Sequence, residues 1–313
     1  MGVGIFVQLG VVEMSGSEFI ASGISTEAAV AAGTLYVVAT PIGNLGDLSA
    51  RAREVLSSVQ LIAAEDTRHT RQMLQAFGID TALTSLHEHN EMQKSETLIT
   101  RLLAGESIAL VSDAGTPLIS DPGFDLVAAA RARGVSVAVV PGPCAAIAAL
   151  SIAGLPTDRF VFEGFLPAKN AARVARLRAL ASEQRTMIFY EAPHRLLEVL
   201  RDMAAELGGQ RSASVSRELT KRFETTYTGT LAELSEIAEK NADMARGEIV
   251  IVVSGNPADA GTAQALNADQ LLRALLDELS PSQAAKVAAK LSGEKRSELY
   301  ARAMQLSGGK GED

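Results

Sequence analysis

Between Thr34 and Val140 the chain alternates short apolar, β-rich runs with amphipathic stretches. The runs cover 34–40, 60–66, 82–87, 107–112 and 135–142, and segments such as 50–59 and 124–134 separate them. Apolar runs of four to eight residues that alternate with helical patterns are typical of βαβ units. The pattern therefore predicts a parallel sheet, with ligand-binding loops at the carboxyl ends of its strands.

The pattern changes after Gly154. Strands are predicted at 159–164, 185–192, 211–219, 223–230 and 248–255, with helices at about 170–183, 194–207 and 231–241. Two strands in direct succession favour a mixed sheet. Glycine and proline interrupt the periodicity between Gly154 and Asp158, which indicates a domain junction there.

Both ends of the chain have a different character. Residues 1–32 lack the basic start of a secretory signal, and we interpret them as a mobile extension. Residues 254–269 have the composition of a linker, and three short helical patterns follow, the second beginning with a good capping sequence at Ser280. The predicted organisation is an extension (1–32), an N-terminal α/β domain (33–154), a C-terminal α/β domain (155–256) and a linker with a helical tail (257–313).

Composition narrows the class of protein. The hydrophobic fraction of 47% is enough for two cores, and no apolar run reaches the ~18 residues of a membrane span. A single cysteine, Cys144, excludes an internal disulfide, and four histidines without CxxC or HExxH give no metal signature. We expect a cytoplasmic protein that binds neither a membrane nor a metal.

The net charge of −8 argues against a nucleic-acid partner, but the charge is unevenly distributed. Residues 166–222 hold 11 lysines and arginines against 6 acids, and the remaining residues hold 18 against 31. This basic stretch is either a phosphate-binding face or a set of solvated helix faces, and charge alone does not separate the two.

Three strands end in loops rich in glycine and proline, at 38–44, 111–123 and 139–145. No GxGxxG follows a strand and no GxxxxGK[ST] occurs, so an ordinary dinucleotide or ATP site is not expected. Glycine and proline terminate many strands, but three such strand ends in succession indicate a ligand site. In the second loop we expect Asp121 to cap the following helix and Asp113 to face the ligand.

The motifs VATPIGN, SDAGTPLISDPG, PGPCA, FEGFLP, FYEAPHR, SRELTKRFET and RGEIVIVV resemble the tetrapyrrole methylase superfamily. Within it they are similar to the ribosomal RNA small subunit methyltransferase I family, as is the tail segment GEKRSELYARAM. The resemblance implies an α/β, two-domain (class III methyltransferase) fold with a small C-terminal helical tail, and a homodimer. It also implies 2′-O-methylation of a cytidine ribose in 16S rRNA of the small ribosomal subunit, with S-adenosylmethionine held in the cleft between the domains.

By motif position, the resemblance assigns donor contacts to residues of both domains. These are Pro41, Asp113, Ala114, Gly115, Thr116, Pro117, Pro143, Cys144, Ala145, Glu191, Gly247, Glu248 and Ile249.

A ribose hydroxyl is a weak nucleophile, so a general base should assist its attack. Glu65 and His89 are our candidates, because both lie in polar clusters at predicted strand ends, although such residues are more often helix caps or surface groups. A His87/His89 metal pair lacks a third ligand. We expect phosphate contacts from Arg68, Lys169, Arg195, Arg217, Lys221 and Arg222. For Arg217 an internal ion pair with Glu218 is an equal alternative.

Three other functions are consistent with parts of the sequence. A methyltransferase for a tetrapyrrole precursor would share the fold and the donor but would not need the basic stretch. A non-catalytic RNA-binding factor of ribosome assembly would not bind the donor. A metal hydrolase built on the acids and histidines lacks the ligand spacing.

Overall fold

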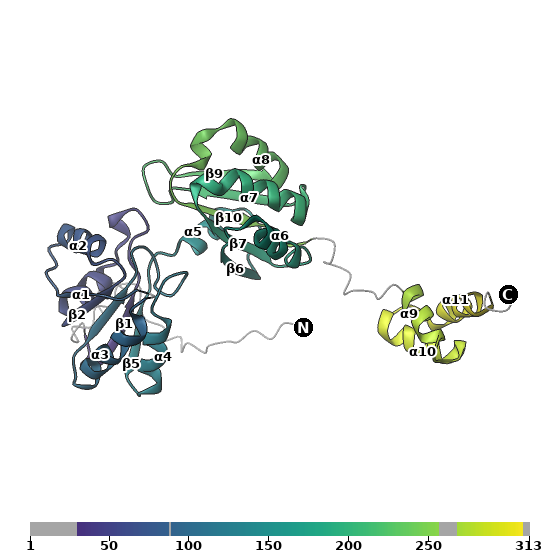
Figure 1. Cartoon of the computed structure of the whole chain (residues 1–313), viewed down its shortest axis with the longest axis horizontal. Helices are drawn as coiled ribbons and strands as arrows, with labels where there is room; N and C mark the ends of the chain where they lie inside the picture. Colours follow the sequence, from purple (N-terminus) through teal and green to yellow (C-terminus); the bar gives the residue numbers. More distant parts are fainter. Residues whose placement is uncertain (1–29, 88, 257–267, 309–313) are drawn as a thin grey trace, which may run out of the picture. The chain divides into compact units, whose positions relative to one another are not determined.

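The computed structural model describes residues 30–87, 89–256 and 268–308. Its internal contacts divide the chain into two compact units at Ala145 and Ala146 (Figure 1). The domain limits expected from the sequence stay predictions, and most of the expected extension and linker (1–29 and 257–267) lies outside the described residues. Residues 30–32 belong to the first unit, since Val30 packs on its core and the Ala31 N–H donates to the Tyr36 hydroxyl at 2.7 Å.

The first unit contains the predicted parallel sheet. Its strands are β1 (Thr34–Val38), β2 (Leu61–Ala64), β3 (Leu83–Ser85), β4 (Ile108–Val111) and β5 (Ser136–Val140). They lie in the order β3-β2-β4-β1-β5, and every pair is parallel. The connecting helices are α1 (Ala50–Ser58), α2 (Thr67–Ala76), α3 (Glu91–Leu103) and α4 (Phe124–Ala132), with a short 3-10 turn at Leu45–Asp47.

Both faces of the sheet are covered at its central strands, which explains why β2 and β4 are apolar and buried along their whole length. On one face, side chains of α1 and α2 such as Val55 and Leu74 pack against alternate strand residues such as Val38. On the other face, α3 and α4 contribute Leu98 and Leu126 to a second core. A doubly covered parallel sheet leaves the strand ends as the open part of the unit.

The second unit contains the predicted mixed sheet. Its strands are β6 (Phe160–Phe165), β7 (Thr186–Glu191), β8 (Ser212–Arg217), β9 (Thr225–Thr230) and β10 (Ile249–Val253). The order is β6-β7-β10-β8-β9; β6 and β7 are parallel and the other pairs are antiparallel. The helices are α5 (Ala145–Ile152), which begins at the division between the units, α6 (Asn170–Ala179), α7 (Leu196–Met203) and α8 (Leu231–Lys240). Short helical turns lie at Pro193–Arg195, Ala204–Gly208 and Ala242–Ala245.

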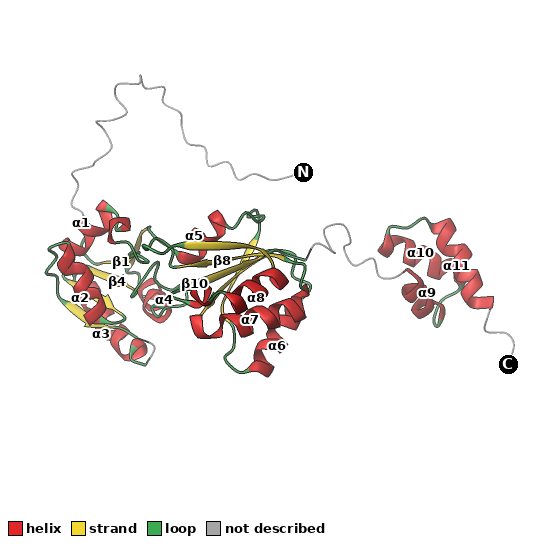
Figure 2. Ribbon diagram, turned by 90° about the horizontal axis from the view of Figure 1, so that it is seen from above, coloured by secondary structure: helices red, strands yellow, loops and turns green. Residues whose placement is uncertain are grey.

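Helices α6, α7 and α8 gather on one side of the second sheet (Figure 2). Their buried side chains, including Leu177, Leu200 and Leu234, form one core with Phe189 and Ile251 of the sheet. The helix that follows β9 begins with a capping box between Thr230 and Glu233, which fixes its start directly at the strand end.

The predicted helical tail contains α9 (Ala268–Leu276), α10 (Pro281–Ser292) and α11 (Arg296–Gly308). Leu272, Leu299 and four alanines form a small core of their own. Within the described ranges, no helix has the length and apolar character needed to cross a bilayer.

Candidate active site

The five parallel strands of the first unit direct their following loops to one edge of the sheet. Pro41 follows β1, Glu65 follows β2 and His89 follows β3. The segments 113–117 and 143–145 follow β4 and β5. The tertiary structure therefore brings the residues that the sequence singled out in this half of the chain to a common edge.

Hydrogen bonds join the three glycine-proline loops at this edge. Thr40 and Gly115 exchange backbone hydrogen bonds of 2.8 and 3.1 Å, and the Thr116 hydroxyl donates to the Pro143 carbonyl at 2.9 Å. Gly115 has a φ of +85°, and a Cβ there would lie 3.3 Å from the Ile42 side chain and 3.7 Å from the Pro143 oxygen. Only glycine combines that backbone conformation with so close an approach.

Two carboxylates lie in the loop after β4. The Asp113 carboxylate accepts a hydrogen bond of 2.9 Å from the backbone N–H of Asp66, which ties this loop to the end of β2. Burial, together with the neighbouring charge of Asp113, raises the pKa of Asp121 to about 6, although a hydrogen bond from Ser112 opposes the shift. Asp113 thus connects two loops, and Asp121 adds a carboxyl that becomes protonated in mildly acidic solution.

The expected capping role of Asp121 is wrong. The N-cap of α4 is Gly123, which has no side chain to contribute, and its φ is +124°. The carboxylate of Glu91, buried on α3, accepts instead from the backbone N–H groups of Gly123, Asp125 and Leu126 at 3.0, 2.9 and 3.3 Å. Residues 32 to 35 positions apart in the sequence supply this cap, so no local signal could reveal it.

The two candidate bases have different surroundings. Glu65 is half-buried directly after β2 and makes contacts with its neighbours. His89 is exposed after β3, with its ring centroid 6.1 Å from that of His87. Next to Glu65, Asp66 caps α2 and forms an ion pair of 2.7 Å with Arg68, which holds the pKa of the Asp66 carboxyl well below its usual range. Catalytic roles for Glu65 and His89 stay predictions.

In the second unit, the donor contacts expected from the resemblance lie at one end of the mixed sheet. Glu191 ends β7 and pairs with Ile249, the first residue of β10, and Ile249 pairs in turn with Arg217 at the end of β8. Glu191 is 3% exposed, and burial raises its pKa against the opposing effects of the Ala192 N–H and the Arg195 charge.

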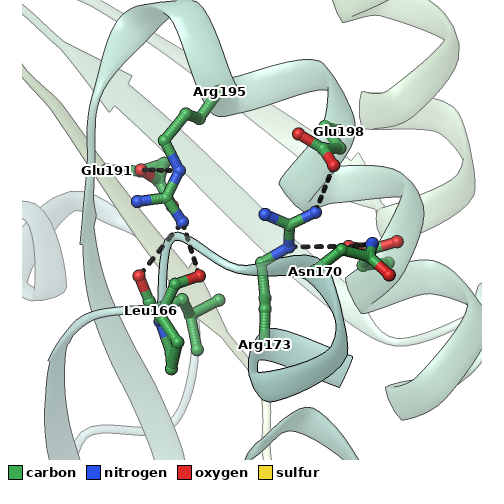
Figure 3. A network of polar contacts seen from close by, with 8 residues as sticks. Leu166, Asn170, Arg173, Glu191, Arg195 and Glu198 are labelled. Carbon is green, nitrogen blue, oxygen red and sulfur yellow. Dashed lines mark hydrogen bonds and ion pairs between the residues drawn. The ribbon is translucent and has the colours of Figure 1, made fainter. Parts of the chain in front are cut away.

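Arg195 holds this end of the sheet together (Figure 3). Its guanidinium donates to the carbonyl oxygens of Leu166 and Pro167 at 3.0 Å each and lies 3.4 Å from the Glu191 carboxylate. Beside it, the buried Arg173 pairs with Glu198 and Asp202. The FEGFLP and FYEAPHR motifs are thus connected through the side chain of Arg195.

The third motif at this end is shaped around Gly247. Its φ is +75°, and a Cβ would overlap the carboxylate of Glu218 at 2.1 Å. The Glu218 N–H donates to the Glu248 carbonyl at 2.9 Å, and Lys221 pairs with both carboxylates at 2.9 and 3.0 Å. Arg217 donates to backbone carbonyls rather than to Glu218, so the alternative of an Arg217–Glu218 ion pair is wrong.

Nine of the eleven cations in the basic stretch have internal partners. These are Arg173, Arg176, Arg178, Arg185, Arg195, Arg201, Arg211, Arg217 and Lys221. Among the cations expected to contact RNA, Arg68, Arg195, Arg217 and Lys221 are thus engaged within the protein, and phosphate contacts by them stay predictions. Lys169 is exposed, and Arg222 is exposed over the Phe223 ring with its guanidinium carbon 5.6 Å from the centroid.

Comparison with known proteins agrees with this architecture. Residues 34–235 match the family described as Tetrapyrrole (Corrin/Porphyrin) Methylases, and residues 262–307 match the RsmI C-terminal HTH domain. Among solved structures, the uroporphyrin-III-C-methyltransferase of Thermus thermophilus has a TM-score of 0.52 at 19% identity, covering 71% of this chain and 94% of its own. The methyltransferase CobJ has a TM-score of 0.53 at 21% identity, covering 72% and 95%. These likenesses confirm the predicted class III methyltransferase fold.

Sequence relatives are much closer. "Ribosomal RNA small subunit methyltransferase I" of Xylella fastidiosa (strain Temecula1) is 57% identical over 86% of this chain and 98% of its own length. The proteins of that name from Pseudomonas aeruginosa and Escherichia coli O157:H7 are 54% and 51% identical, over 89% and 88% of this chain and 99% and 96% of their own. The chain therefore belongs to the tetrapyrrole (corrin/porphyrin) methylase family and, within it, to the ribosomal RNA small subunit methyltransferase I proteins.

Proposed function

We propose that this protein transfers the methyl group of S-adenosylmethionine to the 2′-hydroxyl of a cytidine ribose in 16S rRNA of the small ribosomal subunit. The observation that carries the proposal is identity of 51 to 57%, over nearly the whole of their length, to relatives named for methylation of small-subunit ribosomal RNA. The cytidine and its 2′-oxygen come from the resemblance of the motifs and are the finer part of the proposal.

The joined loops of the first unit suit a donor of this chemistry. Gly115, which is hydrogen-bonded to Thr40, lets the backbone approach a ligand closely. The three loops carry no lysine or arginine that would repel a sulfonium. The half-buried Asp113 carboxylate could accept hydrogen bonds from ribose hydroxyls, as acidic residues at strand ends do in nucleotide sites. The other proposed contacts at this edge are Pro41, Ala114, Thr116, Pro117, Pro143, Cys144 and Ala145. In the second unit they are Glu191, Gly247, Glu248 and Ile249.

When bound, the donor would supply an electrophilic methyl group on a sulfonium. The protein's main contribution would then be to hold the ribose oxygen in line with that carbon, an effect that reaches ~7 to 11 kcal/mol in well-oriented systems. Glu65 or His89 would accept the proton of the 2′-hydroxyl, because both follow strands at the edge that carries the donor loops.

The alternatives make different predictions. The solved tetrapyrrole-directed neighbours share the fold, but identities of 19 and 21% carry no information on the substrate. A tetrapyrrole-precursor methyltransferase would bind the donor and leave the RNA unmodified. A non-catalytic assembly factor would bind the subunit without binding the donor.

The decisive experiment is transfer of labelled methyl from S-adenosylmethionine to small subunits from a strain that lacks the modification, followed by nucleoside mapping. Label on a cytidine 2′-oxygen supports the proposal. If the protein binds the donor but leaves the RNA unlabelled, the tetrapyrrole alternative takes its place, and absence of donor binding would exclude an enzyme of this kind.

The candidate bases are tested in the same assay. Glu65→Gln and His89→Ala should each be compared with an exposed counterpart, Glu54→Gln on α1 and His69→Ala on α2. Loss of the base is expected to lower kcat by ~10²- to 10⁴-fold with donor affinity retained. A candidate whose substitution leaves kcat within twofold of its counterpart is not the base.

Two further parts of the proposal come from the resemblance, which implies a homodimer, and from the single cysteine, which fits the cytoplasm. We propose a homodimer in the cytoplasm, and light scattering of the purified chain at assay concentration tests the dimer. A monomer with full methyl transfer would contradict it.

A further inference from the structure

The helical tail presents a basic surface of its own, and its role rests on the function proposed above. Helix α10 begins with a capping box between Ser280 and Gln283 and with Pro281 in its first turn. It ends at Gly293, whose φ of +73° is left-handed. Residues 293–295 separate it from α11. This three-residue segment is the short glycine-containing turn of a helix-turn-helix pair.

The core of the tail fixes the faces of these two helices. Ala284, Ala285 and Ala288 of α10 are fully buried, as are Leu299 and Ala303 of α11. Small alanine side chains let the two helices approach closely. Packing between the helices therefore stabilises them and fixes which of their side chains face outward.

Cations and an aromatic ring share the outward side. Lys286 and Lys290 follow Ser282 at intervals of four residues, which places all three on one face of α10. The Arg296 guanidinium, from the first turn of α11, lies 3.4 Å from the Ser282 hydroxyl and so adjoins this face. One turn further along α11, Tyr300 is 43% exposed. We name Lys286, Lys290, Arg296 and Tyr300 the tail face.

The charges of the tail face are available to a partner. Among the described residues, neither lysine nor Arg296 has a carboxylate within 4.0 Å, whereas Lys295 and Arg302 pair with Glu298 and Glu294. Residues 281–308, which comprise α10, the turn and α11, carry five cations against two acids in a chain of net charge −8. The cations of the second sheet domain are mostly engaged internally, so the tail face is a more accessible basic cluster than the stretch 166–222.

We propose that the tail face docks onto RNA of the small ribosomal subunit. The three cations contact backbone phosphates, and Tyr300 stacks on an unpaired base or packs on a ribose. Phosphate contacts of this kind position a substrate without reading its sequence, so the tail holds the subunit while the strand-end loops carry out the chemistry.

The test uses the full chain with Lys286→Gln, Lys290→Gln and Arg296→Gln combined. Glutamine preserves length and helix propensity, so α10 and α11 should remain folded, and far-ultraviolet circular dichroism checks this. Arg273→Gln on α9 is the matched control, because it removes an exposed cation of the same tail outside the tail face. Binding of small subunits is measured without the methyl donor between 50 and 200 mM salt.

Each lost phosphate contact lowers the slope of log affinity against log salt by ~0.7 to 0.9, so the triple variant should lose about 2 to 3 of slope. Over this fourfold rise in salt, the wild-type chain should lose about 20- to 40-fold more affinity than the triple variant. In the transfer assay the KM for subunits should rise while kcat and donor affinity stay unchanged, and Tyr300→Ala should weaken binding without changing the slope.

An unchanged slope and KM in the triple variant would overturn the proposal. Weaker subunit binding with an unchanged slope would instead indicate that the tail contacts a ribosomal protein, which also overturns it. Because binding is measured without the donor, a failure of the methyltransferase function appears separately, as binding without transfer.

Discussion

At the scale of single residues, Glu91 has a structural role that sequence patterns did not reveal. Its buried carboxylate accepts three backbone hydrogen bonds at the start of α4, directly after the glycine-proline loop 111–123. Glu91→Ala should destabilise the protein by about 2 to 4 kcal/mol, because buried N–H groups lose their acceptor. Urea unfolding measures this, with the exposed Gln93→Ala on the same helix as control. If Glu91→Ala lowers the free energy of unfolding by less than Gln93→Ala does, water replaces the carboxylate as the acceptor for these N–H groups.

Asp121 makes stability depend on pH. Its folded pKa of about 6 exceeds the ordinary value of 3.8, so between these values the folded chain binds more protons than the unfolded chain. The contribution of this group to stability therefore falls as the pH rises from about 4 to about 6. Asp121→Asn should gain stability relative to wild type over that interval, measured by urea unfolding at pH 4.5, 5.5 and 7. Asp125→Asn is the exposed control, and a difference that stays flat with pH would contradict the assignment.

At the scale of elements, the strand-end loops work as a joined set. Gly115→Ala would place a methyl group 3.3 Å from Ile42 in a backbone conformation that disfavours side chains. Gly78→Ala imposes a similar conformational cost at φ +69° with nothing within 4 Å, and is therefore the matched control. Both should lose about 1 kcal/mol of stability. Gly115→Ala alone should also weaken donor binding at least tenfold in calorimetry, and equal donor affinity in the two variants would exclude Gly115 from the donor site.

At the scale of the whole molecule, folding decides which charged side chains are paired and which remain available. A count along the sequence finds an excess of five cations between Leu166 and Arg222. In the folded chain most of the cations in this stretch form ion pairs with carboxylates or donate hydrogen bonds to backbone carbonyls. Some of these carboxylates, such as Glu163 and Glu239, lie outside the stretch. Local net charge therefore overstates the phosphate-binding capacity of this region. The tail has fewer cations, but within the described residues a larger share of them lacks an acidic partner.

The sequence by itself determined the elements and the family. The sequence was enough to predict a parallel sheet followed by a mixed one. The signals were apolar runs at 34–40 and 107–112, helical periods between them and two successive strands after Arg211, and these patterns are set by local geometry and burial. The glycine-proline loops, together with the motifs of the second domain and in the same order, sufficed for the methylase resemblance.

Only the tertiary structure decided which side chains meet. It showed Glu91, not Asp121, at the start of α4, Asp113 bonded to the end of β2, and Arg195 holding Glu191 and the segment after β6. These contacts join residues from 4 to 47 positions apart, and most of them cross between elements. A pattern read along the chain reports period and propensity, whereas the pairing of a buried charge depends on which elements the fold places side by side.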